Sequence, residues 1–288
     1  MLFDCAGKPL DLSRPAVMGV LNLTPDSFSG DGLVRGIDTD KRIDVACARA
    51  LAMQAAGAAV IDIGGESTRP GAAAVSPHEE LRRVLPVIER LASQLRVPIS
   101  IDTRQPQVMR AAVAAGAGLI NDVAALRTPG ALTAAGELGV PVVLMHMQGQ
   151  PGTMQQAPQY GDVVAEVAAF LAGRVAACEQ AGIAREQLLL DPGFGFGKTA
   201  AHNLALLRGL PRLMQQAHLQ ALPVVAGLSR KSLIGVITGA PVAQRLGGSI
   251  ALALLAAQRG ARLLRMHDVA EATQALAMLD AVQGGTDD

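Results

Sequence analysis

Eight short apolar runs recur along the chain, and alanine- and leucine-rich segments with helical periodicity lie between most of them. Each run is continuous and aliphatic, which is typical of a strand covered on both faces. The alternation of such strands with helices predicts a parallel sheet. The predicted strands span residues 16–21, 59–63, 99–102, 118–121, 140–145, 188–191, 224–227 and 262–265.

The helix boundaries have their own sequence patterns. Residues 76–79 (SPHE) have the pattern of a capping box with proline at the first helical position, and Thr128-Pro129 is expected to start another helix in the same way. Two long apolar helices are expected at 242–258 and 269–282. Glycines that can take a positive φ follow four predicted helices, at Gly57, Gly116, Gly182 and Gly260.

Eight strand–helix units in a chain of this length predict a closed (β/α)₈ barrel. An open, doubly wound sheet shares the same local pattern and is the alternative. The barrel is preferred because there are eight units, and because no proline-, serine- or charge-rich linker divides the sequence. The prediction is therefore a single α/β domain over residues 1–288.

Polar or glycine-rich residues follow nearly every apolar run on its C-terminal side. In a barrel these ends meet at one rim, where active sites lie. Helix capping explains a single Asp, Asn, Ser or Thr in such a position, but it does not explain Lys231, Arg265 or His267. A functional site at the C-terminal rim is therefore expected.

Composition narrows the class of protein. The chain has 288 residues, of which 50% are hydrophobic, and 25 Lys and Arg balance 25 Asp and Glu. This excludes disorder and argues against a nucleic-acid or membrane-surface partner. The first 13 residues lack the apolar core of a signal peptide, and no run reaches membrane-spanning length. Three scattered cysteines suggest no disulfide framework, so a cytoplasmic location is expected.

Two near-motifs are rejected. Residues 192–199 resemble a phosphate-binding P-loop but begin with proline, and residues 227–231 resemble a nucleophile elbow but end with lysine. No cluster of histidines and cysteines offers a transition-metal site built by the protein alone. The chemistry must therefore come from the rim residues together.

Five segments in order resemble the dihydropteroate synthase family. They are residues 22–29 (NLTPDSFS), 65–71 (GESTRPG), 191–198 (DPGFGFGK), 229–232 (SRKS) and 265–269 (RMHDV). The resemblance covers almost the whole chain. The first loop departs from the family pattern at Gly30-Asp31, which leaves no firm role for Asp31.

The resemblance implies a (β/α)₈ barrel of folate biosynthesis. Such an enzyme joins (7,8-dihydropterin-6-yl)methyl diphosphate to 4-aminobenzoate, and it releases diphosphate and 7,8-dihydropteroate. Mg²⁺ accompanies the diphosphate, sulfonamides compete at the aminobenzoate site, and members are commonly homodimers. The C-terminal helices are the expected dimer interface, because their apolar stripes exceed what one packed face needs.

The resemblance also assigns roles to residues. The expected pterin-binding residues are Asp102, Asn121, Asp191, Lys231 and Met145. Those expected at the diphosphate are Asn22, Arg69, Arg265 and His267, with Asn22 also a Mg²⁺ ligand, and Asn22, Lys231, Arg265 and His267 form the catalytic set. Those expected at the aminobenzoate are Ser67, Thr68, Pro70, Phe28, Phe196, Ser229 and Arg230.

These residue types suit the chemistry. A carboxylate can accept both the ring N–H and the exocyclic NH₂ of a pterin edge, a role that the resemblance gives to Asp191, and an arginine offers a rigid fork of donors to a phosphate. An amide oxygen such as that of Asn22 suits Mg²⁺ that is otherwise held by phosphate and water. A dissociative displacement is expected, with charge accumulating on the departing diphosphate. Mobile loops near 22–38 and 64–76 are expected to cover the substrates.

Three alternatives remain from the sequence. A methyltetrahydrofolate methyltransferase-like barrel would share the pterin contacts but would have no use for the Ser-Arg-Lys and Arg-Met-His motifs. A paralogue could bind pterin with little or no turnover. A barrel with only a general phosphate grip would show no selective pterin binding.

Overall fold

The structure is a computed structural model that describes residues 1–24, 39–67, 75–150 and 152–284. Eight parallel strands close into one barrel, as predicted. Around the barrel they run β10 (Ala261–Met266), β3 (Ala16–Asn22), β4 (Val60–Gly64), β5 (Ile99–Asp102), β6 (Leu119–Asp122), β7 (Val142–Met145), β8 (Leu188–Asp191) and β9 (Val224–Ala226).

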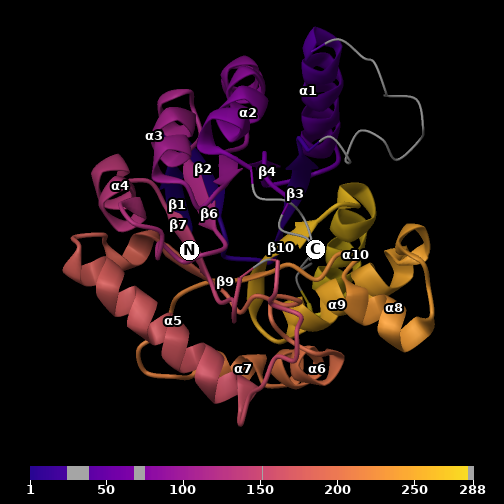
Figure 1. Cartoon of the computed structure of the whole chain (residues 1–288). Coiled ribbons are helices and arrows are strands. Elements are labelled where there is room, and N and C mark those ends of the chain that lie inside the picture. Colours follow the sequence, from indigo (N-terminus) through magenta and orange to yellow (C-terminus); the bar gives the residue numbers. More distant parts are fainter. Residues whose placement is uncertain (25–38, 68–74, 151, 285–288) are drawn as a thin grey trace.

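Helices surround the barrel strands in a ring (Figure 1). They cover the outer faces of the strands and enclose the main apolar core between sheet and helices. They are α1 (Thr39–Ala55), α2 (Pro77–Ala92), α3 (Pro106–Ala114), α4 (Ala131–Leu138), α5 (Val163–Gln180), α6 (Ala200–Arg208), α7 (Leu210–Met214), α8 (Ser232–Thr238), α9 (Leu246–Gln258) and α10 (Val269–Val282), with the 3₁₀ turns η2 (Arg185–Gln187) and η3 (Val242–Gln244).

An N-terminal hairpin closes one end of the barrel, and the sequence analysis did not predict it. Strands β1 (Leu2–Cys5) and β2 (Lys8–Asp11) pair antiparallel. Their buried side chains pack against barrel residues that include Met18 and Leu189. Gly118 permits this packing, since a Cβ there would lie 2.2 Å from the Cys5 carbonyl oxygen. The opposite end of the barrel therefore carries the C-terminal ends of the strands.

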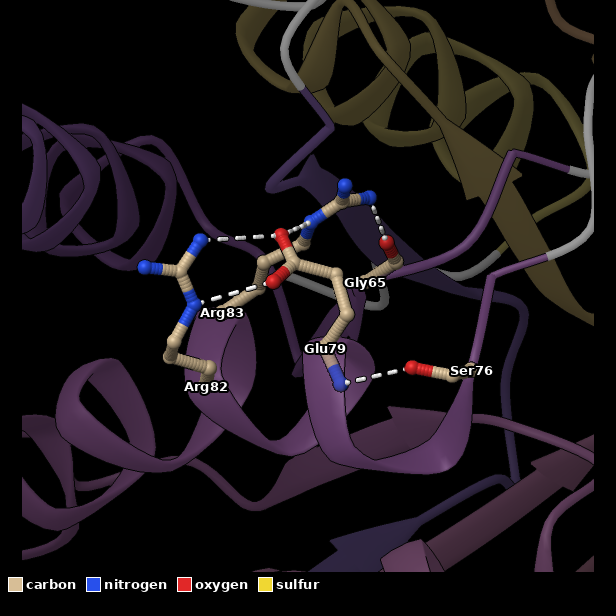
Figure 2. Close-up of polar contacts among 5 residues, drawn as sticks. All are labelled: Gly65, Ser76, Glu79, Arg82 and Arg83. Atoms are coloured by element: carbon tan, nitrogen blue, oxygen red, sulfur yellow. Dashed lines mark hydrogen bonds and ion pairs between the residues drawn. The ribbon is translucent and has the colours of Figure 1, made fainter.

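Helix α2 begins with only half of the predicted capping box. Ser76 Oγ accepts a hydrogen bond of 3.2 Å from the Glu79 backbone N–H, as expected. The Glu79 carboxylate instead binds Arg82 and Arg83, each through Nε at 2.9 Å (Figure 2). Arg83 also donates to the Gly65 carbonyl at 2.8 Å, so this helix start is tied to the end of β4.

Two other predicted boundaries were wrong. The helix expected to begin at Thr128-Pro129 begins at Ala131, after Gly130 at φ +83°. The helix expected over 242–258 is broken at Arg245, which separates η3 from α9. The Arg245 side chain binds the carbonyl of Ala240 at 3.0 Å, and this contact fixes the break.

The four glycines predicted after helices all have positive φ, between +83° and +113°. The predicted bounds of β5 and β8 match the structure, whereas β7 begins two residues later than expected, at Val142. Pro141 lacks an N–H for strand pairing, which explains the later start. Within the described residues, no helix combines the length and apolar character needed to cross a bilayer.

Candidate active site

A cleft of about 470 Å³ opens at the C-terminal ends of the strands. It collects many of the predicted site residues from distant parts of the chain. Those that line it are Asn22, Ser67, Asp102, Phe196, Ser229, Arg230, Lys231, Arg265 and His267. The expected convergence at one rim is therefore observed for these residues.

Arg265, on β10, lies between two carboxylates. Its Nε donates to Asp62 Oδ2 at 2.6 Å, and its Nη2 donates to Asp102 Oδ2 at 2.7 Å. Burial alone would lower the pKa of Arg265, but the charges of Asp62 and Asp102 raise it overall. The guanidinium is thus a fixed positive charge at the wall of the cleft.

Asp62 is a site residue that the sequence analysis missed. It lies within β4, is fully buried, and also accepts a hydrogen bond of 3.2 Å from Asn121 Nδ2. The run 59–63 was interpreted as apolar, yet it contains this one carboxylate. A charged residue inside a strand covered on both faces requires a partner, and that was the available clue.

Asp102 ends β5 and is paired in register with Asn121 on β6. Burial raises the pKa of the Asp102 carboxyl to about 7, while the Arg265 charge opposes the shift. Asp191 ends β8 and accepts a hydrogen bond of 2.7 Å from the Gly193 N–H. Burial also raises the pKa of Asp191. Hydrogen bonds donated to either carboxylate would therefore stabilise its charged form, which burial disfavours.

Lys231 lines the same cleft as Asp102. Its Nζ lies 4.2 Å from the centroid of the Phe196 ring, a cation–π contact. Burial, followed by the charge of Arg265, lowers its pKa to about 8, and Asp191 opposes this change. Phe196 thus contacts a predicted pterin-binding lysine, besides lining the cleft where an aryl contact was expected.

Ser229 holds His267. Its Oγ accepts a hydrogen bond of 3.2 Å from the His267 backbone N–H and lies 3.0 Å from the ring Nδ1. Burial and the charge of Arg265 lower the pKa of His267 to about 3, so the ring is neutral near pH 7. When the hydroxyl donates to Nδ1, the ring proton is on Nε2, where it can be donated to a ligand.

Arg230 forms an ion pair with Asp268 through two nitrogens, Nε at 3.0 Å and Nη2. The sequence analysis expected Arg230 at the aminobenzoate and did not foresee this partner. Arg245 also lines the cleft, and it donates to the backbone carbonyl of Arg230 at 3.1 Å. It supports the segment that carries Arg230 and Lys231, and no sequence motif pointed to it.

Three predicted pterin residues lie behind the lining of the cleft. Asn121, Asp191 and Met145 are buried and are not among its lining residues. Asn121 is joined to the cleft through Asp62 and Arg265, and Asp191 through its interaction with Lys231. Met145 belongs to an apolar cluster with Phe196 and Met154, both of which do reach the cleft.

The segment after β8 is built around a buried lysine. Lys198 Nζ contacts His146 Nδ1 and the Gly193 carbonyl, both at 2.9 Å, and the Phe196 carbonyl at 3.1 Å. Burial lowers the pKa of Lys198 to about 7, but its three acceptors match the three donors of an ammonium group. His146 is therefore part of the support for this loop.

Some predictions fall outside the described residues. They are the roles of Phe28, Thr68, Arg69 and Pro70, the departure at Gly30-Asp31, and most of the loops expected to be mobile, near 22–38 and 64–76. Beside the second loop, Glu66 binds Arg104 at 3.2 Å and accepts a hydrogen bond from the Val75 N–H, also at 3.2 Å. These contacts fix the backbone on either side of residues 68–74.

Among the described residues, no group of three or more His, Cys, Asp or Glu could hold a metal ion. Asn22 ends β3 and lines the same cleft as Arg265 and His267. One neutral oxygen donor beside an arginine and a histidine, which can donate to an anion, fits a Mg²⁺ that is held mainly by phosphate oxygens and water.

Comparison with known proteins identifies relatives over nearly the whole chain. The chain matches the family described as "Pterin binding enzyme" over residues 18–267. It is 52% identical over 275 residues to the dihydropteroate synthase of Escherichia coli K12, covering 96% of this chain and 94% of that protein. It is 49% identical to the Haemophilus influenzae enzyme, covering 95% and 96%.

Solved structures give the same result. Xanthomonas albilineans dihydropteroate synthase with 4-aminobenzoic acid has a TM-score of 0.90 and 56% identity, covering 98% of each chain. The same protein with 7,8-dihydropteroate has a TM-score of 0.87 and 54% identity, covering 99% of each. Yersinia pestis dihydropteroate synthase in a sulfonamide complex has a TM-score of 0.91 and 49% identity, covering 98% and 99%. The motifs, the closed barrel and these relatives agree that the chain belongs to the dihydropteroate synthase family of pterin-binding enzymes.

Proposed function

We propose that the cleft at the strand ends is the active site for joining (7,8-dihydropterin-6-yl)methyl diphosphate to 4-aminobenzoate. The chain is a transferase of folate biosynthesis, and its products are 7,8-dihydropteroate and diphosphate. The observation that carries the assignment is the convergence of Asp102, Lys231, Arg265 and His267 on one cleft. One cleft thus contains a hydrogen-bond acceptor that suits the edge of a heterocycle and hydrogen-bond donors that suit an anion.

The pterin end is assigned to the acid-rich side. Asp191 accepts the paired N–H donors of a pterin edge, Asp102 and Asn121 complete the polar lining, and Lys231 donates to the acceptor atoms of the ring. Asn121, Asp191 and Met145 are all buried, which suits contacts with the flat pterin ring rather than with water. The raised pKa of Asp102 and Asp191 supports this assignment, because hydrogen bonds donated by the substrate compensate part of the cost of burying them.

The diphosphate end is assigned to Arg265 and His267, with Arg69 as a further donor. Arg265 supplies a permanent positive charge, and neutral His267 supplies one N–H. Asn22 would hold a Mg²⁺ that arrives with the diphosphate, and this ion would neutralise charge on the leaving group when bound. The chain itself orients the diphosphate and excludes water around the C–O bond that breaks.

The aminobenzoate is assigned to the outer part of the cleft, with Ser67, Phe196, Ser229 and Arg230 beside the segments that carry Phe28, Thr68 and Pro70. The related Xanthomonas protein holds 4-aminobenzoic acid, and the related Yersinia protein holds a sulfonamide drug. Both kinds of compound carry an aromatic amine opposite an acidic group. We therefore expect sulfonamides to compete with 4-aminobenzoate in this chain.

The reaction proposed is a dissociative displacement at the pterin methylene. The C–O bond breaks as negative charge accumulates on the diphosphate, and the aromatic amine then forms the new C–N bond and loses a proton. Stabilisation of the leaving diphosphate is the main catalytic effect of the residues, since donors aimed at developing charge lower the barrier most. The proposal needs no covalent nucleophile from the chain.

The direct test measures 7,8-dihydropteroate from both substrates with Mg²⁺, for the wild type and for Arg265→Ala. We expect kcat to fall by about 10²–10³-fold, as when an anion-stabilising donor is removed. Arg262→Ala is the matched control. Arg262 lies near the start of the same strand, at the end away from the cleft, and donates to the Ser13 carbonyl. Turnover near the wild-type value in Arg265→Ala would refute the assignment.

We also propose a homodimer through the C-terminal helices, in the cytoplasm. Leu255 on α9 and Met278 and Val282 on α10 are 38%, 63% and 81% exposed. Burying such residues against a second copy removes apolar surface from water. The three cysteines are buried free thiols, which suits a reducing compartment. Light scattering that shows only monomer, at concentrations used for the assay, would overturn the dimer.

A further inference from the structure

Lys198 is a buried charge that the proposed reaction does not use. Its side chain is 3% exposed, and its Nζ contacts His146 Nδ1 at 2.9 Å and the carbonyls of Gly193 and Phe196 at 2.9 and 3.1 Å. Burying an ammonium group is costly unless its surroundings compensate for the lost water. The three acceptors account for its N–H groups but not for its charge, because a neutral donor could also hold a backbone carbonyl.

The Gly193 contact connects Lys198 to Asp191. The Gly193 N–H donates to Asp191 Oδ1 at 2.7 Å, and the Gly193 carbonyl accepts from Lys198. Gly193 has φ +69°, and a Cβ there would lie 1.8 Å from the His146 carbonyl oxygen, so this position requires glycine. The residue that holds Asp191 is thus itself held at its carbonyl by Lys198.

The bond from Gly193 leaves Asp191 able to accept a pterin edge. Within the described residues it is the one hydrogen bond to the Asp191 side chain, and it uses a single acceptor position on Oδ1. A carboxylate has two acceptor positions on each oxygen, so both oxygens can still accept the paired donors. A bidentate contact depends on the orientation of the carboxylate plane, which the Gly193 N–H helps to fix.

The charge of Lys198 also acts on Asp191. Burial raises the pKa of Asp191, and the Gly193 N–H is the first group to oppose this rise; the charges of Lys231, Lys198 and Arg265 follow. Lys231 and Arg265 line the cleft, where the substrate would engage them, whereas Lys198 is not among the lining residues. Lys198 is therefore the countercharge that a bound ligand leaves in place.

The Phe196 contact leads to the second proposed pterin group. Lys198 binds the Phe196 carbonyl, and the Phe196 ring lies 4.2 Å from Lys231 Nζ. The backbone that carries this ring is therefore held by the same ammonium group that holds Gly193. One buried lysine thus supports the surroundings of both Asp191 and Lys231.

We propose that Lys198 is a positioning residue for pterin recognition, which fixes the Gly193 backbone that orients Asp191 and supplies a buried countercharge to this carboxylate. Lys198 itself touches no substrate. The inference rests on the pterin subsite of the proposed function, and it adds to that subsite a residue outside the cleft. Diphosphate recognition by Arg265 and His267 does not depend on it.

Calorimetry with 6-hydroxymethylpterin and, separately, with inorganic pyrophosphate and Mg²⁺ tests the role in Lys198→Met. We expect the Kd for 6-hydroxymethylpterin to rise at least about tenfold, the effect of losing a hydrogen bond to a charged group. The Kd for pyrophosphate should stay at the wild-type value. Equal weakening of both ligands would show general damage to the rim and would overturn the role.

Lys8→Met is the matched control. Lys8 also binds two backbone carbonyls, those of Ala92 and Leu95, at 2.8 Å each, but it belongs to the hairpin at the other end of the barrel. Its loss should leave the affinity for both ligands unchanged. A loss of pterin affinity in Lys8→Met as large as that in Lys198→Met would contradict a specific role for Lys198.

A double-mutant cycle shows whether Lys198 acts through Asp191. In an Asp191→Asn background, the added Lys198→Met change should weaken pterin binding much less than it does in the wild type, because a neutral amide needs no countercharge. Losses of the same size in both backgrounds would overturn the connection to Asp191.

His146 gives a second test that does not depend on how well Lys198→Met folds. Asparagine at this position can offer an amide oxygen close to where Nδ1 lies, whereas leucine leaves one N–H of the ammonium without an acceptor. We expect His146→Leu to bind 6-hydroxymethylpterin at least about threefold more weakly than His146→Asn, with equal pyrophosphate binding. Equal pterin affinity in the two variants would refute the role of the ammonium.

The outcomes separate this inference from the proposed function. Unchanged binding of 6-hydroxymethylpterin in Asp191→Asn would refute the pterin subsite itself. A clear loss in Asp191→Asn, together with wild-type pterin affinity in Lys198→Met, would refute the positioning role and leave the subsite intact.

Discussion

Ser229 has a predicted contact and an observed contact that kinetics can tell apart. It was expected to contact the aminobenzoate, and it lies in the cleft as expected, but its hydroxyl is occupied by His267. The two roles have different kinetic consequences, because orientation of His267 affects the leaving diphosphate and a substrate contact affects aminobenzoate binding.

We expect Ser229→Ala to lower kcat about fivefold, equivalent to one hydrogen bond of ~1 kcal/mol, with little change in KM for 4-aminobenzoate. The reason is that His267 loses the contact that orients its ring. Steady-state kinetics with each substrate varied in turn measure the split. Ser232→Ala is the control, since Ser232 lines the same cleft. A rise in KM for 4-aminobenzoate at constant kcat would support the contact role instead.

Glu80 carries the most testable pH dependence of stability. It is fully buried on α2, and burial raises the pKa of its carboxyl from 4.5 to about 7. The Thr103 hydroxyl opposes this rise, and the charge of Glu66 adds to it. The folded state therefore binds a proton that the unfolded state has lost between pH 4.5 and 7. Its contribution to stability is full below pH 4.5 and is lost as the pH rises to about 7.

We expect Glu80→Gln to be more stable than the wild type at pH 8, by up to about 3 kcal/mol, and similar to it near pH 4.5. Urea unfolding at the two pH values measures the difference. Glu89→Gln, an exposed change on the same helix, should alter neither value. Equal stability of Glu80→Gln and the wild type at pH 8 would show that Glu80 is ionised without cost.

At the scale of elements, helix α2 shows which half of a capping motif matters here. Ser76 supplies the cap, while the glutamate three residues later serves Arg82 and Arg83 (Figure 2). We expect Ser76→Ala to lower the free energy of unfolding by about 1 kcal/mol. Ser93→Ala, at the other end of the same helix, should cost less than half of that, because no side-chain cap is made there. Chemical denaturation of both variants measures the two losses in the free energy of unfolding. Equal losses would show that the Ser76 hydroxyl does not cap the helix.

The barrel strands were predictable because a strand covered on both faces has a plain apolar signature. β5 and β8 were predicted to the residue, and the polar residues at their ends marked the rim. The N-terminal hairpin was not, since its two four-residue strands carry charges such as Asp4 and Lys8 and are too short for a clear alternation. Its register depends on packing against the barrel, which no local pattern records.

The candidate site was predictable as a set of residues but not as a network. The sequence analysis named Asp102, Arg265 and His267, and each lies in the cleft. It did not name Asp62 or Arg245, because contacts between residues about 200 positions apart, or between a side chain and a distant carbonyl, leave no spacing in the sequence. Lys198 lies within one of the motifs but was given no partner for the same reason.

At the scale of the whole molecule, the hairpin and the cleft occupy opposite ends of the barrel, so stability and catalysis can be altered separately. We expect Gly118→Ala to destabilise the protein by about 2–3 kcal/mol, because its Cβ would overlap the Cys5 carbonyl. The turnover of the folded enzyme at 25 °C should stay near the wild-type value.

Thermal unfolding and product formation, measured on the same preparations, check both parts of this expectation. Gly173→Ala in α5 is the control, since nothing lies within 4 Å of its added Cβ and alanine favours a helix. It should leave stability unchanged or raise it slightly. A Gly118→Ala enzyme as stable as the wild type would mean that the hairpin shifts to accept the methyl group at no cost.

Because the hairpin closes the barrel end remote from the substrates, the start of the chain is a suitable place for attachments. The Met1 side is exposed, and its carbonyl accepts a hydrogen bond of 2.7 Å from the Leu12 N–H, which anchors the chain just beyond it. An affinity tag, dye or surface tether joined there would point away from the entrance. Immobilised in this way, the enzyme keeps its mouth open to ligands, which suits surface-based measurements of pterin and pyrophosphate binding.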